Sequence, residues 1–527
     1  MIDKEKQRHN YRPVDLYYQH VTRNNDSWCP LPWAQVAVHN SGEFRSCIQA
    51  RSCRKTKGIL KDSNDKIMRA EANTIDEVRN APLLKEVRQD MLKGKRHSMC
   101  IRCNDEDDAK MNSRRRNAIR EYYLKYGYDL FDAEASTKLD GTLVIKKAPV
   151  LEWDIRLGNL CNLRCRMCHP SESTQWYDEW FDTMFKGFKT DFTKVQLTKE
   201  NGKGKAKLQD DIYSWYGKSN FFDEFDSNSV GTRKIYFSGG EPTLVENMYD
   251  MLQKLIDSGM AKDMELEYNI NLTNIPKRAI SLWHEFKKVQ LGCSIDGVGK
   301  INEYIRAPSK WDKIDENIKW LDANTKSNIV LFNTFTWQIL NAVEVFDLVK
   351  YQIKNNFTKF NSSVNSVFFS MHFLHSPDYL NVKALPKELK EYVQYEFDKF
   401  DNEFFKPWVD SLSDDDRVLG HRFKQADKNV QPEIPIFQEM FPLPKKYLTK
   451  DKFDEKNKNY DWYGTKRKFY EKWKTKMQSM LDFMWSEDKS QHFDEFVQRT
   501  RIQDKYRNES FDELYPVISS YIRKNHK

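Results

Sequence analysis

The sequence predicts an α/β protein whose central region builds a mostly parallel sheet. Six strand-like segments alternate with amphipathic helical segments between about residues 150 and 375. A cysteine-rich region precedes them, and a region with apolar residues at helical spacing follows them. Strands that alternate with helices indicate parallel βα units, in either a barrel or a doubly wound sheet.

The six expected strands are rich in β-branched and aromatic residues, and they lie at 150–157, 234–238, 265–272, 289–295, 329–337 and 366–374. Amphipathic helical segments lie between most of them, as at 245–259 and 341–355. The first connection is unusually long. It contains the Gly- and Lys-rich segment 201–211, which we expect to be an exposed insertion.

The flanking regions differ from the centre in composition. The N-terminal region holds five of the nine cysteines and ends in a basic helical stretch at 113–126, and the polar segment 134–142 follows. From about residue 384, aromatic and apolar residues recur at helical spacing over 387–408 and 468–485. We expect these to be the core faces of packed helices.

Composition narrows the class of protein. The chain of 527 residues is 39% hydrophobic and 31% charged, which allows two or three cores beneath a charged surface. Its formal charge of +8 is too small to imply a nucleic-acid partner. No apolar run reaches the roughly 20 residues needed to cross a bilayer, and the first residues lack the apolar core of a signal peptide. These features predict a cytoplasmic protein with reduced thiols that bind metal or do redox work.

Three cysteines follow the first expected strand in the segment LGNLCNLRCRMCHP. Cys161, Cys165 and Cys168 have the spacing C-x3-C-x2-C. Three thiolates on one loop can bind three irons of a 4Fe–4S cluster and leave the fourth iron open to another ligand. The spacing alone leaves two alternatives, a structural zinc site or a cluster completed by a distant fourth cysteine.

A second motif follows the second expected strand, in the segment SGGEPTL. Its paired glycines, Gly239 and Gly240, allow close backbone approach, and Glu241 can accept a hydrogen bond from an ammonium. In an array of parallel βα units, both motifs lie at the carboxyl ends of strands, where barrel enzymes place their active sites.

With these motifs the region 148–380 resembles the core of the radical S-adenosylmethionine (SAM) superfamily. The resemblance implies a partial (βα)6 TIM-like barrel, with a 4Fe–4S cluster on the three cysteines and SAM bound at the open iron. It implies that Met167 contacts the adenine and that Gly239, Gly240, Glu241 and Pro242 bind the SAM ammonium. The candidates for ribose or carboxylate contacts are Thr273, Asn274, Ser294, Arg306 and Asn341. Ser and Asn at strand ends also commonly cap the next helix, which is the alternative for several of these. The alternative for Asp296 is that it only anchors a turn, and Cys293 is expected to be a buried apolar residue rather than a ligand.

The N-terminal cysteines form a separate pattern. The segment from Cys29 reads C-x12-G-x4-C to Cys47, and Cys100 and Cys103 close it as C-x2-C. Residues 28–105 thereby resemble a SPASM/twitch iron–sulfur domain, here preceding the core instead of following it. Together with the basic helix they make up the expected domain 28–133. The resemblance implies one auxiliary 4Fe–4S cluster on these four cysteines, with Cys53 as a spare ligand. Zinc is the alternative occupant. Residues 1–27 are expected to be an extension, and 381–527 a mostly helical region.

The resemblance also implies a reaction and partners. A reduced cluster cleaves SAM to a 5′-deoxyadenosyl radical, which abstracts hydrogen from a substrate, and the auxiliary domain favours a peptide or protein side chain. The expected electron donor is flavodoxin or ferredoxin, and the location is the cytoplasm, that of a host if a phage encodes the chain. His372 and His375 are candidate proton-transfer groups, although polar residues at a strand end are commonly just solvated.

Two other functions compete with this hypothesis. Arg114, Arg115, Arg116 and Arg120 on one helical stretch would suit nucleic-acid modification, although such a run is usually a solvated face or an ion-pair surface. A non-catalytic iron–sulfur or zinc scaffold is the other alternative. Production of 5′-deoxyadenosine separates both enzymes from the scaffold.

Overall fold

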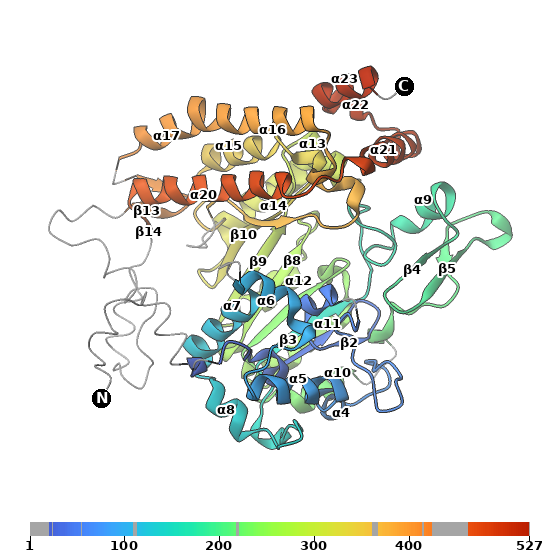
Figure 1. Ribbon diagram of the computed structural model, residues 1–527, viewed down its shortest axis with the longest axis vertical. Coiled ribbons are helices and arrows are strands. Elements are labelled where there is room, and N and C mark those ends of the chain that lie inside the picture. Colours follow the sequence, from blue (N-terminus) through green and yellow to red (C-terminus); the bar gives the residue numbers. More distant parts are fainter. Residues whose placement is uncertain are drawn as a thin grey trace. The chain divides into compact units, whose positions relative to one another are not determined.

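The structure is a computed structural model, and it describes residues 21–23, 25–53, 55–108, 113–217, 221–360, 367–413, 416–423 and 462–525 (Figure 1). They form two compact units. The first contains the described residues up to Gly158 together with Ile212–Phe237. The second contains Asn159–Asp211 and the described residues from Ser238 onward. The domain boundaries expected at 133, 148 and 380 stay predictions, and the expected extension at 1–27 lies largely outside the described residues.

The first unit combines a short sheet with small helices. Strand β1 (Gln35–Val38) pairs in parallel with β3 (Glu152–Leu157) and antiparallel with β2 (Phe44–Arg45). The helices are α3 (Leu31–Ala34), α4 (Ile75–Arg79), α5 (Pro82–Leu92), α6 (Ile101–Asp108), α7 (Arg114–Glu121), α8 (Leu130–Ala135) and α10 (Phe221–Asn228). The basic stretch expected to be helical is therefore α7, which continues as a π-helix over Tyr122–Tyr126.

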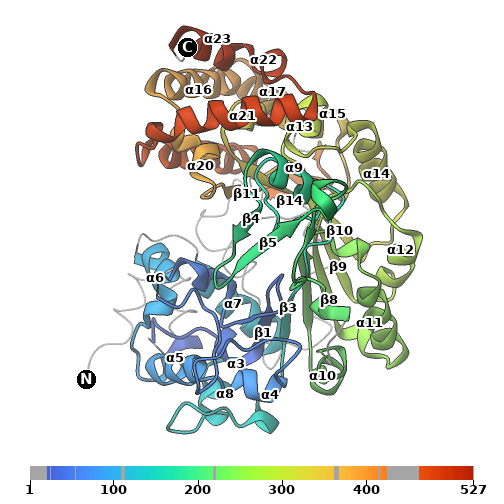
Figure 2. The same cartoon turned by 90° about the vertical axis from the view of Figure 1, so that its right-hand side faces the viewer.

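The second unit contains a run of parallel strands. Its members are β8 (Glu265–Ile270), β9 (Lys288–Ser294), β10 (Ile329–Trp337) and β11 (Ser370–Phe373), each paired in parallel with the next. Strand β7 (Lys234–Gly239) spans the division between the units, at Phe237. The helices α11 (Glu246–Asp257), α12 (Lys277–Trp283), α13 (Lys300–Ile305), α14 (Trp311–Asn324) and α15 (Val345–Asn355) lie between successive strands along the chain (Figure 2). The expected α/β class is confirmed.

Buried apolar side chains place these strands in the core. In β9, Val289, Leu291 and Cys293 are fully buried, and Cys293 has no exposed surface. This confirms the interpretation of Cys293 as a buried apolar residue. The last expected strand, 366–374, is shorter in the structure, because β11 covers only Ser370–Phe373.

Aromatic side chains hold the C-terminal helices together. These helices are α16 (Lys387–Phe400), α17 (Lys406–Ser411), α20 (Lys466–Trp485), α21 (Phe493–Arg507), α22 (Phe511–Leu514) and α23 (Pro516–Asn525). Phe405 stacks on Trp473 with ring centroids 4.3 Å apart, and Phe346 stacks on Phe400 at 4.4 Å. The expected helical C-terminal region is confirmed. No helix among the described residues is both long and apolar enough to span a membrane.

The long first connection contains structure that the sequence did not indicate. After α9 (Trp176–Thr183), strands β4 (Gly187–Lys189), β5 (Lys194–Thr198) and β6 (Lys207–Leu208) form a small antiparallel sheet. We call this three-stranded element the inserted sheet. The Gly- and Lys-rich segment 201–211 supplies its last strand and exposed turns.

Candidate functional site

The three central cysteines lie on a single loop of the second unit, residues 159–175, which we call the cysteine loop. Cys161 and Cys165 are buried, Cys168 is half-buried, and all three are free thiols. Cys161, Leu163 and Cys165 pack together, with Met167 and Cys168 against them. The spacing C-x3-C-x2-C therefore brings the three sulfur-bearing residues into one small cluster.

Hydrogen bonds within and beside the loop fix its course. The Asn159 side chain donates to the carbonyl oxygen of Pro170 at 2.7 Å and contacts the Tyr177 hydroxyl at 2.7 Å. Trp176 donates its indole N–H to the carbonyl oxygen of Cys165 at 3.1 Å. The Ser173 hydroxyl donates to the carbonyl oxygen of Leu163. Because both edges of the loop are tied down, the cysteine positions are set before any ligand binds.

The thiols have unequal acidities. A hydrogen bond from Cys168 lowers the pKa of Cys165 to about 7, and the nearby Arg306 guanidinium lowers it further, against the effect of burial. Burial raises the pKa of Cys161 to about 12. The hydrogen bond with Cys165, together with burial, raises the pKa of Cys168 well above its usual value. Three thiolates in this space therefore need a cationic centre to compensate them, and iron would supply that charge.

Arg306 joins the cysteine loop to the end of β9. Its Nη1 lies 3.9 Å from the sulfur of Cys165, and its Nη2 lies 2.7 Å from Oδ2 of Asp296. Burial works to lower the pKa of Arg306, but the Asp296 carboxylate and the cysteine thiols outweigh it and raise that pKa. Burial raises the pKa of Asp296, which has no exposed surface and accepts the Thr336 N–H at 2.7 Å. Arg306 is thus a fixed cation beside Cys165.

The Gly-Gly-Glu turn after β7 packs on the cysteine loop. The Glu241 N–H donates to the carbonyl oxygen of Leu160 at 2.7 Å. A Cβ on Gly240 would overlap that same carbonyl group, so only glycine permits the approach. Gly239 has φ +127°, which also favours glycine. We expected the glycines to admit a ligand, and the neighbour that Gly240 admits in the structure is the cysteine loop.

The carboxylate of Glu241 is turned into the protein. It is 4% exposed, and it accepts hydrogen bonds from the Thr243 hydroxyl at 2.7 Å and from the Asn271 N–H at 2.8 Å. Burial raises its pKa to about 7. The side chain therefore anchors the turn to the end of β8, with Pro242 buried beside it. Its expected contact with the SAM ammonium stays a prediction.

Three polar side chains connect the cysteine loop to the segment after β8. Asn162 donates to the Thr273 hydroxyl at 2.8 Å and accepts from the Asn271 amide at 2.8 Å. The Thr273 hydroxyl also donates to Oδ1 of Asn271 at 2.7 Å. Thr273 was expected at the site, whereas Asn162 and Asn271 were not. The position of Asn162 between two of the cysteines was the available signal.

The other expected contacts lie in different environments. Asn341 has no exposed surface, and its amide donates to the carbonyl oxygens of Asp296 and Thr336, both at 3.0 Å. Ser294 is half-buried with its hydroxyl 3.4 Å from that of Thr334, and Asn274 is exposed. Asn341 therefore supports the Asp296 turn from inside. The expected binding roles of these residues and of Met167 stay predictions.

A C-terminal helix holds the cysteine loop through Arg166. This side chain, 1% exposed, lies between two of the cysteines in sequence and pairs with Asp504 and Glu509, both at 2.6 Å. Its guanidinium carbon lies 3.6 Å from the ring centroid of Tyr304, whose hydroxyl also donates to Asp504 at 2.7 Å. Sequence reasoning missed this contact because about 340 residues separate the partners.

A second helix contact reinforces the first. Arg507, also on α21, pairs with the buried carboxylate of Glu179 on α9 at 2.8 Å. It also donates to the carbonyl oxygen of Arg164 at 3.0 Å. Side chains of α21 therefore contact the cysteine loop at Arg164 and Arg166, the two residues on either side of Cys165.

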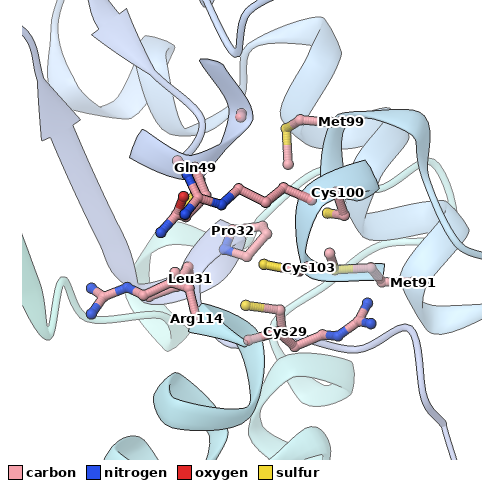
Figure 3. Close-up of a pocket in the computed structure, with 13 residues that line it drawn as sticks. Cys29, Leu31, Pro32, Gln49, Met91, Met99, Cys100, Cys103 and Arg114 are labelled. Carbon is pink, nitrogen blue, oxygen red and sulfur yellow. The ribbon is translucent and has the colours of Figure 1, made fainter. Parts of the chain in front are cut away.

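In the first unit, the other four expected cysteines line one pocket. Figure 3 shows Cys29, Cys100 and Cys103 with their sulfur atoms directed toward a common space, and Cys47 lines the same pocket. The apolar part of the lining includes Leu31, Pro32, Met91 and Met99. Cys53 does not line the pocket. The structure therefore brings together the four cysteines that were expected to act together and leaves the spare one out.

Burial dominates the electrostatics of this pocket. It raises the pKa of Cys100 to about 12 and that of Cys47 to about 11, and it raises that of Cys29 well above its usual value. The Arg114 guanidinium works in the opposite direction on Cys47. Four sulfur donors in an apolar, partly basic pocket fit either a 4Fe–4S cluster or zinc, because both take four thiolates.

Helix α5 contains Leu84 and Arg88 in a Leu-x-x-x-Arg pattern, and its arginine supports the pocket. The Arg88 side chain has no exposed surface. It donates to the carbonyl oxygens of Pro32 at 2.9 Å, Gly141 at 2.8 Å and Arg79 at 2.8 Å. Burial lowers its pKa to about 9. Arg88 thus fixes the backbone of the Cys-Pro-Leu-Pro-Trp segment that carries Cys29.

Comparison with solved structures gives distant matches. The structure titled anSMEcpe with bound AdoMet is 17% identical with a TM-score of 0.31, over 51% of this chain and 63% of that one. Streptococcus suis SuiB bound to the precursor peptide SuiA is 12% identical with a TM-score of 0.28, over 61% and 64%. The chain spans less than two thirds of the length of either relative. TM-scores this low give no evidence of function.

Comparison with protein families gives a match to part of the chain. No curated protein matches the sequence. Residues 155–346 match the family model of the Radical SAM superfamily. This range begins in β3 and ends in α15, and it includes the cysteine loop, the Gly-Gly-Glu turn and the Arg306–Asp296 pair. The segment that carries the candidate site is thus the segment that matches the Radical SAM superfamily.

Proposed function

We propose that the chain is a radical SAM enzyme whose cluster is held by Cys161, Cys165 and Cys168. The observation that carries the proposal is the packing of these three cysteines against the Gly-Gly-Glu turn and Arg306, within the segment that matches the superfamily. When bound and reduced, the 4Fe–4S cluster supplies an electron that cleaves SAM to methionine and a 5′-deoxyadenosyl radical, which removes a hydrogen atom from the substrate.

The chain's own residues position and shield this chemistry. The cysteine loop is tied to the Gly-Gly-Glu turn through Leu160 and to the end of β8 through Asn162, so its thiolates are held in place. Arg306 supplies a fixed positive charge beside Cys165. Burial of Cys161 and Cys165 keeps water from two of the three ligand positions.

A second cluster is the corresponding proposal for the first unit. Cys29, Cys47, Cys100 and Cys103 line one pocket, and four thiolates fill all four iron positions of a cubane. Such a site has no open iron, so its role would be electron transfer or support of the fold. Zinc would serve only the second of these roles.

The proposed substrate is a peptide or protein side chain. Support comes from the likeness of the N-terminal cysteine pattern to SPASM/twitch domains of peptide-modifying enzymes. The proposed electron donor is a flavodoxin or ferredoxin, and the proposed location is the cytoplasm, both by the same resemblance.

Nucleic-acid modification loses its main support in the structure. Arg114 pairs with Glu152 at 2.8 Å and lines the cysteine pocket. Arg115 pairs with Asp107, and Arg116 pairs with the same carboxylate at 2.9 Å. Three of the four arginines, Arg114, Arg115 and Arg116, are thus engaged in ion pairs of the first unit.

Anaerobic reconstitution tests the proposed function. The protein, loaded with iron and sulfide and then mixed with dithionite and SAM, is expected to form 5′-deoxyadenosine, measured by liquid chromatography. Cys165→Ala is expected to abolish this product, because it removes a cluster ligand. Cys293→Ala is the matched control, since that cysteine is buried in β9, is not among the described residues that pack around the three cysteines, and should leave product formation intact when replaced. Full iron loading without any 5′-deoxyadenosine would leave the non-catalytic scaffold as the function.

A further inference from the structure

A second concave site lies beside the cysteine loop in the second unit. It is a cavity of about 580 Å³ between the inserted sheet, α9 and His169, the residue that follows Cys168. Ligand-binding clefts usually have volumes of about 300–1,000 Å³. None of the expected SAM or cluster residues lines this cavity, so the proposed function leaves it without a role.

Four aromatic rings line the cavity. Trp180, Phe185, Phe188 and His169 line it, and neighbouring rings lie with their centroids 6.1–6.4 Å apart. The ring planes are tilted by 48–54° to one another, so they form a cup. Phe185 is 57% exposed, which is unusual for a side chain of this size.

Three exposed lysines also line the cavity, and we call them its rim. Lys186, Lys189 and Lys194 line it, and no aspartate or glutamate does so among the residues that the structure describes. Lys189 and Lys194 face each other as a cross-strand pair of β4 and β5, and like charges placed opposite each other destabilise a sheet. No salt bridge in the described part of the chain neutralises any of the three. By contrast, Lys199 on the same insertion is paired with Asp182 at 2.8 Å.

We propose that this cavity, the aromatic cup with its lysine rim, binds an acidic segment of the peptide substrate and takes one apolar side chain of that segment into the cup. Carboxylates would pair with the three lysines, and an apolar side chain would cover the exposed ring of Phe185. The cavity would thereby select the substrate at a place directly next to the cysteine loop, since His169 is the neighbour of Cys168. The inference rests on the proposed function for the identity of the bound chain as substrate.

The cavity favours a peptide over a single-stranded nucleic acid. Sequence-tolerant nucleic-acid binding uses aromatic faces on which successive bases stack along a basic track. Here the tilted rings enclose one small space, and the cations are grouped at its rim. A cup of this kind accepts one side chain, and the lysines around it suit the carboxylates of the same segment.

Fluorescence anisotropy on the full-length reconstituted protein tests the inference. The probe is a labelled octapeptide of glutamates with one central leucine, at low salt, and the comparison probes are the same peptide with lysines for glutamates and an octauridylate. The variant Lys186→Glu, Lys189→Glu, Lys194→Glu reverses the rim. The matched control Lys203→Glu, Lys205→Glu, Lys207→Glu makes the same charge change on exposed lysines of the insertion that do not line the cavity.

We expect the rim variant to weaken binding of the acidic peptide at least about tenfold, since three favourable charge pairs become repulsive. The control should change it less than about twofold. Phe185→Ala should weaken binding of the leucine peptide but not of an all-glutamate peptide. Equal effects of rim and control variants, equal binding of the lysine peptide, or tighter binding of octauridylate that the rim variant abolishes would each overturn the proposal.

The outcome of this peptide-binding test can be distinguished from the outcome of the 5′-deoxyadenosine test of the proposed function. The rim variant leaves all seven expected cluster cysteines and the Gly-Gly-Glu turn intact, so formation of 5′-deoxyadenosine without substrate should persist in it. Loss of peptide binding with retained 5′-deoxyadenosine supports the cavity. If the rim variant still binds the acidic peptide, the proposed role of the cavity is wrong, whether or not 5′-deoxyadenosine forms.

Discussion

At the residue scale, the site depends on a few side chains that act on the cysteine loop. Arg306 contacts both the Cys165 sulfur and the Asp296 carboxylate, and its planar fork lets one side chain reach both. Lysine has a single point charge and cannot do the same. The hydrogen bond from Cys168, and to a smaller extent this fixed cation, keep Cys165 the most acidic of the three thiols, with a pKa of about 7. Cys165 is therefore the first of the three to be ready as a metal ligand at neutral pH.

Gly240→Ala tests the close approach of the turn and the loop. Its Cβ would overlap the Leu160 carbonyl group, so the cysteine loop must shift. We expect iron bound per chain to fall by roughly half, the loss of one cubane out of two, and 5′-deoxyadenosine to fall at least about tenfold. Gly217→Ala is the control, because a Cβ there meets no atom within 4 Å and Gly217 has no positive φ. If Gly240→Ala leaves bound iron and product unchanged, the close contact between the turn and the cysteine loop is not needed for the site.

At the element scale, the C-terminal helix α21 is part of the site. Arg166 is buried, and its charge is compensated by the carboxylates of Asp504 and Glu509 and by the ring of Tyr304. Asp504 also accepts the Phe511 N–H at 2.7 Å, which fixes the start of α22. Helix α21 therefore does more than cover the core, because it holds the loop that carries the cysteines.

Asp504→Asn is expected to lower the free energy of unfolding by about 3 kcal/mol, the cost of removing one partner from a buried ion pair. Urea denaturation of the apoprotein in reductant measures it. Asp512→Asn is the matched control near the same helix, because its pair with Arg501 is 3.0 Å long but half exposed. Such pairs contribute about 0–1 kcal/mol. Similar losses in both variants would mean that the Arg166 contact is no stronger than a surface pair.

At the scale of the whole molecule, local patterns were predictable and distant contacts were not. Strand β10 lies where its β-branched and aromatic run predicted, and the cysteine spacing located both groups of thiols. The Arg166–Asp504 pair has no local signal, since its partners are 338 positions apart. The inserted sheet was missed because the Lys- and Gly-rich composition of its connections resembles an exposed loop. Glu241 and Asn341 were found by motif, yet their hydrogen bonds to the protein could come only from the structure.

We propose above all that Cys161, Cys165 and Cys168 hold a cluster with one iron open to SAM. The most direct test is electron paramagnetic resonance of the variant Cys29→Ala, Cys47→Ala, Cys100→Ala, Cys103→Ala, reconstituted and reduced with dithionite. This variant should bind about four irons per chain, one cubane, and addition of SAM should shift the signal of that cluster, because SAM would bind at the open iron. A four-iron signal that does not change when SAM is added would contradict the claim.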